Sequence, residues 1–149
     1  MQSPDLVLWT IGYERFPTPE ELRETLLAAG VERVCDVRAL PRSRRRGFSR
    51  RALQDLLADE GITYEHWGEL GNPAELREVF RSGALEEGRA AFRARLREGY
   101  TWAVDALAGA LAERPTAVLC LEDDPAHCHR GVILEELVAR HPSVRVVRL

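Results

Sequence analysis

Short apolar runs alternate with amphipathic segments along the 149-residue chain. Near-continuous apolar runs predict strands that are buried on both faces of a sheet. The clearest such runs cover residues 6–11 and 116–121, and residues 31–37, 62–67 and 144–149 are predicted as three further strands. Because a strand covered on both faces is typical of parallel sheets, the pattern favours parallel pairing.

Two helices are predicted in the first half of the chain from leucine spacing and from terminal residues. Thr18 and Ser49 are suitable N-caps, and Gly30 and Gly61 are suitable C-terminal stops. In the second half, residues 74–113 are predicted to form helical pieces. A last helix is predicted over residues 132–139. The breaks within the longer segment are predicted at Gly83, Gly88 and Gly99.

Strands that alternate with helices predict an α/β fold. We expect a single domain over residues 1–149, with a mostly parallel sheet of about five strands and helices on both faces. Ligands of such sheets bind beyond the carboxyl ends of the strands. The residues that follow the predicted strands are Tyr13, residues 36–44, residues 66–71 and residues 122–131.

All 21 basic residues are arginine, and the chain contains no lysine. This excludes a Schiff-base lysine, a pyridoxal phosphate anchor and the lysine of a phosphate-binding P-loop. The net charge of −3 excludes a globally basic nucleic-acid binder, but it leaves room for a local basic patch.

Three cysteines at irregular spacings, Cys35, Cys120 and Cys128, do not form a disulfide framework. Residues 1–12 lack the positive and long apolar regions of a signal peptide. No apolar stretch approaches the roughly 18 residues of a membrane span. We therefore expect a cytoplasmic protein that does not interact with membranes.

A carboxylate and two guanidinium groups follow the second predicted strand, in Asp36, Arg38 and Arg44. Arginine forks recognise phosphate or carboxylate, and Asp36 can orient Arg38 or act as a base. The alternative is an ion pair that only holds a loop in place. Ser43 lies beside Arg44 and is a further candidate ligand-binding residue.

The run from Arg42 to Arg51 contains six arginines and no acidic residue. Such a run can neutralise the phosphates of a nucleic acid or another anionic ligand. Phe48 lies within it and is predicted to stack on a base. The alternative is a solvated loop whose arginines pair with nearby glutamates.

The segment from Glu122 to Gly131 lies between the most apolar strand and a helix. Cys128 is a candidate nucleophile or redox thiol, and Arg130 with the free N–H groups of the helix is a candidate anion site. If Asp124 caps the helix instead, Cys128 belongs to the core.

A metal site is a further alternative for this segment, with Cys128, His127, His129 and either Cys120 or Glu122 as ligands. The segment lacks a CxxC or HxxxH pair, and adjacent residues rarely reach one ion together. We therefore predict no metal and no cofactor.

Several well-known catalytic patterns are absent from the sequence. A phosphatase-type cysteine requires an arginine six positions later, but Leu134 follows Cys128 and Ala126 follows Cys120 at that distance. No GxSxG, GxGxxG or HExxH motif occurs.

Tyr64 and His66 share one face of the third predicted strand, where His66 is either a general base or a hydrogen-bonded structural residue.

The ordered set of motifs resembles the family catalogued as domain of unknown function 488. The matching stretches are Thr10-Ile11-Gly12-Tyr13, Asp36-Val37-Arg38 with Pro41, Ser43 and Arg44, Gly61-Ile62-Thr63-Tyr64 with His66, Leu70-Gly71, and Cys120, Glu122 and Cys128-His129-Arg130. Glu14 departs from the family pattern, and residues between 71 and 114 match only loosely. The resemblance implies a shared site at one end of the sheet and not a known activity.

We interpret the chain as an enzyme for an anionic, phosphate-bearing substrate such as a nucleotide or nucleic acid. The candidate catalytic residues are Cys128, His129, Asp36 and Glu122. The candidate ligand-binding residues are Tyr13, Arg38, Ser43, Arg44, His66 and Arg130. The alternative is a non-catalytic nucleic-acid or nucleotide binding module that uses the loop from Arg42 to Arg51. A structural protein with a polar corner is the third possibility, and the sequence leaves the oligomeric state open.

Overall fold

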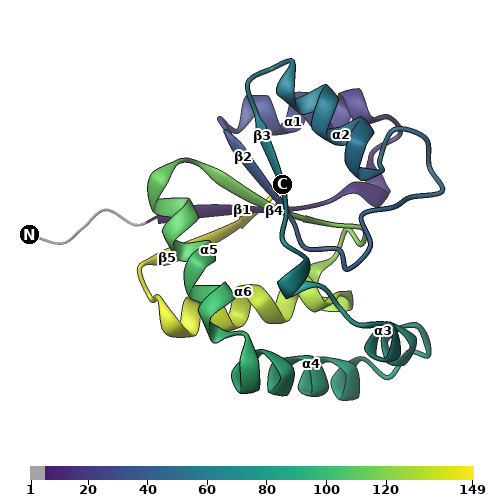
Figure 1. Ribbon diagram of the computed structural model, residues 1–149, viewed down its shortest axis with the longest axis vertical. Helices are drawn as coiled ribbons and strands as arrows, with labels where there is room; N and C mark the ends of the chain where they lie inside the picture. Colours follow the sequence, from purple (N-terminus) through teal and green to yellow (C-terminus); the bar gives the residue numbers. More distant parts are fainter. Residues whose placement is uncertain (1–5) are drawn as a thin grey trace, which may run out of the picture.

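A computed structural model describes residues 6–149 and contains one five-stranded sheet in which every pair of neighbours is parallel (Figure 1). The order across the sheet is β3-β2-β4-β1-β5. The strands are β1 (Leu6–Gly12), β2 (Arg33–Asp36), β3 (Thr63–His66), β4 (Thr116–Cys120) and β5 (Val144–Arg148). The predicted parallel α/β fold is therefore confirmed.

Helices cover both faces of the sheet (Figure 1). The helices α1 (Pro19–Ala28) and α2 (Arg50–Ala58) lie on one face, whereas α5 (Thr101–Glu113) and α6 (His129–Arg140) lie on the other. Helices α3 (Ala74–Arg81) and α4 (Leu85–Gly99) form an outer layer, in which α4 packs against α5 and α6. No helix in residues 6–149 is long and apolar enough to cross a membrane.

Each face of the sheet has its own hydrophobic core. Ile11, Val34 and Leu119 point toward α1 and α2, whereas Leu8 and Val118 point toward α5 and α6. Successive residues of a strand alternate between its two faces, so an unbroken apolar run serves both cores. This is the reason why the apolar pattern identified the strands.

The helix boundaries differ from the predictions at one glycine, at the start of the last helix and at one cap. Gly88 lies inside α4, whereas Gly83 separates α3 from α4 and Gly99 ends α4. The last helix begins at His129 instead of residue 132, because Cys128 is its N-cap. Asp124 caps the short 3-10 helix η3 (Pro125–His127), so the alternative in which it caps the long helix is not realised.

The strand order places a crevice at the carboxyl ends of the central strands. From β1 the chain crosses by α1 on one face of the sheet to β2, and from the neighbouring β4 it crosses by α6 on the other face to β5. Connections that leave neighbouring strands in opposite directions open a crevice between them, and ligands bind there. Two more 3-10 helices, η1 (Tyr13–Arg15) and η2 (Gly68–Leu70), follow β1 and β3 at this end.

Candidate functional site

A pocket of about 630 Å³ opens at the carboxyl ends of the central strands, and this volume is ordinary for a small-molecule site. Its wall combines the loop after β2, helix α3 and the β4–α6 connection. The lining residues are Tyr13, Arg38, Ala39, Leu40, Arg42, Ser43, Arg44, Asn72, Arg77, Phe80, Arg81, Cys120, Leu121, Glu122, His127, Cys128 and His129. Seven of the ten predicted site residues are among them, whereas Asp36, His66 and Arg130 are not.

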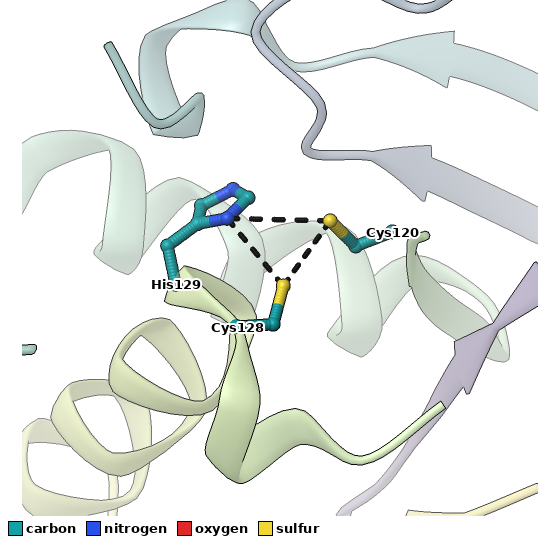
Figure 2. A group of neighbouring side chains, drawn as sticks. All are labelled: Cys120, Cys128 and His129. Atoms are coloured by element: carbon teal, nitrogen blue, oxygen red, sulfur yellow. Dashed lines mark hydrogen bonds between the residues drawn. The ribbon is translucent and has the colours of Figure 1, made fainter. Parts of the chain in front are cut away.

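Two thiols and one imidazole form a buried cluster at the floor of this pocket, hereafter the Cys-Cys-His cluster (Figure 2). Cys120 ends β4, Cys128 caps α6, and His129 is the first residue of α6. The two Sγ atoms lie 3.2 Å apart. The His129 Nδ1 lies 3.5 Å from the Cys128 Sγ and 4.0 Å from the Cys120 Sγ.

The sequence spacing of this cluster argued against a metal site, but the fold changes the geometry. Cys128 has an extended backbone with φ of −140° and ψ of 152°, whereas His129 is helical. This change of conformation lets two adjacent side chains point to the same place. The strand end brings Cys120 beside them, so that all three potential ligand atoms lie within 4.8 Å of one another.

The surroundings orient the imidazole and the second sulfur. The His129 Nε2 lies 2.7 Å from the carbonyl oxygen of Val37, so this nitrogen carries the proton and Nδ1 presents a lone pair to the sulfurs. The backbone N–H of Arg130 donates to the Cys128 Sγ at 3.4 Å. The Glu122 Oε2 lies 3.6 Å from the Cys120 Sγ.

Charge and burial act in opposite directions on the two thiols. The hydrogen bond from Cys128 holds the pKa of Cys120 well below its usual value, and the charges of His129 and Arg130 act in the same sense. Burial raises the pKa of Cys128. The two thiols are a coupled pair in which the Cys128 thiol donates to the Cys120 Sγ.

The two polar side chains beside the sulfurs also titrate away from their usual values. Burial alone lowers the pKa of His129, but the negative charge of Cys120 more than offsets this, so its pKa is raised. Burial also raises the pKa of Glu122, and the charge of Cys120 adds to the rise. The floor of the pocket can accept a metal ion, exchange protons or supply a sulfur nucleophile.

Arg130 lies behind the pocket wall and does not line the pocket. Its side chain is completely buried, and its Nη2 donates to the carbonyl oxygens of Glu122 at 2.6 Å and Asp123 at 3.3 Å. Its Nε and Nη1 have no hydrogen-bond partner among residues 6–149. The expectation that Arg130 clamps an anion is therefore not met by its position.

Asp36 lies under the site as the centre of a buried network. Its carboxylate accepts hydrogen bonds from the Arg38 Nε at 2.9 and 3.0 Å, from the Arg38 Nη2 at 2.6 Å and from the Tyr64 hydroxyl. The carboxylate is completely buried and does not reach the pocket, so a role as base has no support in its position. Burial raises the pKa of Tyr64, and the carboxylate of Asp36 adds to this.

His66 contacts the main chain of the loop after β2 in this structure. Its Nε2 lies 2.7 Å from the carbonyl oxygen of Arg38, and it does not line the pocket. Arg38 itself lines the pocket, although its Nη1 donates to the carbonyl oxygen of Phe48 at 2.8 Å. Both residues therefore hold the loop that follows β2.

That loop, residues 37–49, is hereafter the arginine loop. Phe48 is buried, and its ring stacks on Tyr13 with 5.0 Å between the ring centroids. The prediction that Phe48 stacks on a base is therefore wrong, because a single aromatic side chain in a charged run was assigned to the ligand instead of the core. Arg42 and Arg44 are exposed and line the pocket.

Arg45 anchors the arginine loop to the segment after β1. Its Nη1 donates to the carbonyl oxygens of Tyr13 at 3.2 Å and Glu14 at 3.1 Å, and its Nη2 donates to that of Phe16. The alternative that these arginines pair with glutamate side chains is thus not realised at Arg45, which binds main-chain oxygens. Ser43 contributes a turn, since its Oγ accepts the backbone N–H of Arg45 at 3.0 Å.

Sequence reasoning missed the part of the pocket that comes from α3 and the residues before it. Asn72, Arg77, Phe80 and Arg81 line the pocket there. Arg77 and Arg81 are one helical turn apart and lie on one face. This spacing was visible in the sequence, but the rule of strand ends does not point to a helix.

Gly12 allows β1 and the β4–α6 connection to approach each other closely. A Cβ atom at this position would lie 1.9 Å from the carbonyl oxygen of Glu122. The neighbouring main-chain bond from the Glu14 N–H to the Leu121 carbonyl oxygen measures 2.9 Å. The contact therefore fixes the backbone beside Glu122 and Cys120.

A comparison with curated proteins and one with solved structures found no match. A family model described as "Domain of unknown function DUF488" matches residues 18–137. This range includes the arginine loop, α3 and the complete Cys-Cys-His cluster. The family whose motifs the sequence resembles is thus the family to which the chain belongs, the one described as domain of unknown function DUF488.

Proposed function

We propose that the pocket is the active site of an enzyme that acts on an anionic, phosphate-bearing substrate such as a nucleotide. The observation that carries this proposal is the charge of the lining. Five arginines line the pocket, and Glu122 is the one acidic residue among the lining residues. The whole chain has a net charge of −3, so the pocket reverses the sign of the molecule.

The arginines differ in how free they are to meet a ligand. Arg38 is bound to Asp36, and the Arg77 Nη1 donates to the carbonyl oxygen of Asn72 at 3.2 Å. Arg42 and Arg44 make no side-chain hydrogen bond or ion pair within the described part of the chain. These two exposed guanidinium groups are the proposed ligand contacts, with forks that suit phosphate oxygens.

The proposed reacting groups lie at the floor of the pocket, below these arginines. The Cys-Cys-His cluster and Glu122 bring two sulfurs, an imidazole and a carboxylate to one wall. A substrate anion that is held at the rim would be positioned over this floor, and positioning with charge stabilisation is a main source of catalysis. We also propose a reducing, cytoplasmic location, because the three cysteines are free.

Ligand binding tests this proposal. Thermal melting and calorimetry with phosphate, nucleotides, ADP-ribose and short DNA should identify at least one phosphate-bearing ligand. We expect Arg44→Ala to lower the affinity for that ligand by about tenfold or more, since a hydrogen bond to a charged group contributes roughly 1.5–3 kcal/mol. Arg46→Ala is the matched control, because Arg46 belongs to the same loop but does not line the pocket.

The same pair of variants separates this enzyme from a non-catalytic nucleic-acid binding module. Arg46, Arg50 and Arg51 are exposed outside the pocket and could neutralise phosphates of a longer strand. A module of that kind predicts equal losses for Arg44→Ala and Arg46→Ala and a steep dependence on salt. Equal losses, or no phosphate-bearing ligand at low salt, would overturn the proposed active site.

A further inference from the structure

We infer that Cys120, Cys128 and His129 bind a zinc ion whose fourth coordination position opens into the arginine-lined pocket. The site itself rests on the geometry of the cluster, whereas the part that the ion plays in a reaction rests on the proposed function. Two sulfurs and one imidazole nitrogen are the donor types that select zinc among the common divalent ions of cells.

The separations within the cluster match those around a tetrahedral ion. With Zn–S near 2.3 Å and Zn–N near 2.0–2.1 Å, two sulfurs are about 3.8 Å apart and a sulfur and a nitrogen about 3.6 Å apart. The observed Sγ–Sγ separation is 3.2 Å, and the two Sγ–Nδ1 separations are 3.5 and 4.0 Å. Shifts of about half an ångström in the side chains are enough to seat the ion.

The groups around the cluster have the arrangement of an outer coordination shell. A metal-binding histidine usually donates its other ring N–H to a carbonyl or a carboxylate, which fixes the ring and its tautomer. His129 does this through Nε2 and the carbonyl oxygen of Val37 at 2.7 Å. The backbone N–H of Arg130 at 3.4 Å from the Cys128 Sγ supplies the second such contact.

Arg130 provides an independent sign that negative charge belongs here. Its guanidinium group is completely buried, donates only to carbonyl oxygens, and leaves Nε and Nη1 without partners among residues 6–149. A buried cation without a countercharge is costly. Ionised cysteine ligands would supply negative charge next to Arg130, whose backbone N–H already donates to the Cys128 Sγ.

One side of the cluster is open. All three ligands and Glu122 line the pocket, so the fourth position faces the space in which the proposed substrate binds. Catalytic zinc sites keep such a position, whereas structural zinc sites close it with a fourth protein ligand. An ion there would polarise an oxygen of a bound substrate or of water, and this is the chemistry that it adds to the pocket.

Metal content is the first test. The full chain without an affinity tag, purified in a reducing buffer without chelator, should contain about one zinc ion per molecule by mass spectrometry. We expect Cys120→Ser and Cys128→Ser each to lower the zinc content at least tenfold. Cys35→Ala is the matched control and should keep its zinc, because Cys35 is equally buried but lies outside the cluster.

A cobalt spectrum of the native sequence keeps the inference testable if the serine variants do not fold. The chelator-treated protein should take up Co²⁺ and show sulfur-to-cobalt charge-transfer absorption with the intense visible bands of four-coordinate cobalt. Added azide should shift the visible bands, because the fourth position is open. A reduced protein that takes up neither ion, or zinc that persists in both serine variants, would falsify the site. Bands that azide leaves unchanged would overturn the open position.

The two proposals can fail separately. Zinc in a protein that binds no phosphate-bearing ligand supports this inference and removes the proposed function. If the protein contains no zinc but binds a phosphate-bearing ligand with an affinity that depends on Arg44, the proposed function is supported and the zinc site is removed. The absence of zinc in the Cys120→Ser variant, with ligand affinity unchanged, would show that the ion does not contribute to binding and that the arginines alone hold the anion.

Discussion

Arg38 is bound to the buried carboxylate of Asp36 through both its Nε and its Nη2, at distances of 2.6–3.0 Å. Two residues at one strand end thereby neutralise each other at the edge of the pocket. The same guanidinium group reaches the carbonyl oxygen of Phe48 and therefore ties β2 to the far end of the arginine loop. Arg38 is already committed before any ligand arrives, in contrast to Arg42 and Arg44.

This pairing predicts a large loss of stability for Asp36→Asn. The substitution keeps the shape of the side chain but leaves the charge of Arg38 buried without a partner, which typically costs about 3–5 kcal/mol. Tyr64→Phe is the comparison, because it removes one hydrogen bond to the same carboxylate and should cost only about 1.5–3 kcal/mol. Urea denaturation of both variants at neutral pH measures the difference. Equal and small losses would mean that the ion pair does not support the loop.

Gly12→Ala should distort the site as well as destabilise the fold. The new Cβ would meet the Glu122 carbonyl oxygen, so the backbone of the β4–α6 connection must move, and we expect a loss of about 1–3 kcal/mol. Gly109→Ala is the control. Nothing lies within 4 Å of a Cβ at this exposed position inside α5, so alanine should stabilise the helix by up to about 1 kcal/mol. Thermal melting separates the two outcomes, and a neutral Gly12→Ala would contradict the close approach.

Phe48 is predicted to be a core residue and not a ligand contact. Phe48→Ala should lower the free energy of unfolding by about 3–5 kcal/mol because it empties the space beside Tyr13. Phe48→Leu keeps most of the volume, and we expect it to cost less than about 1.5 kcal/mol. In calorimetry, the Phe48→Leu variant should bind the phosphate-bearing ligand with the same affinity as the native protein. A tenfold lower affinity for the ligand in a stable Phe48→Leu variant would show that Phe48 contributes to ligand binding.

The contact between α5 and the end of α6 should make stability depend on pH in acid. The Asp105 carboxylate accepts from the Arg140 Nε at 2.9 Å and from its Nη2 at 2.6 Å, and it lies 2.7 Å from the His141 Nε2. The hydrogen bonds from Arg140 hold the pKa of Asp105 well below its usual value. A depressed pKa contributes stability above the unfolded value of about 4 and loses it as the pH falls through the folded value.

The variant Asp105→Asn tests this assignment. The native protein should be the more stable of the two at neutral pH, and the difference should shrink as the pH falls below about 4. Denaturation curves across this range give the result directly. A difference that stays constant with pH would show that the lost hydrogen bonds, and not the ionisation of Asp105, set the effect.

The strands could be read from the sequence because each apolar run serves two cores at once. The start of α6 could not be predicted from the sequence, because two helix-start signals follow each other along the chain. Asp124 and Pro125 begin the short η3, and Cys128 then caps α6 with an extended backbone. Gly88 was predicted to be a helix break, but it lies inside α4 and makes room for the ring of Phe80. A Cβ atom at position 88 would lie 2.9 Å from the Phe80 Cδ2.

Part of the candidate site could also be predicted from the strand pattern. Tyr13, Glu122 and Cys128 follow parallel strands, and parallel strands end at the same edge. Arg77 and Phe80 reach the pocket from α3, a helix whose place depends on packing between α3 and α4 that no strand pattern encodes. The sequence offered Cys120, Cys128 and His129 among possible metal ligands, but the spacing argued against them, because spacing does not show that the end of β4 and the start of α6 meet.

The three main-chain oxygens that Arg45 binds have a consequence for recognition. A segment of thirteen residues without helix or strand would ordinarily lose much freedom when a ligand orders it. Arg45 and the turn at Ser43 already order it in the folded protein. If this loop binds the proposed ligand, its order before binding means that less conformational entropy would be lost on complex formation.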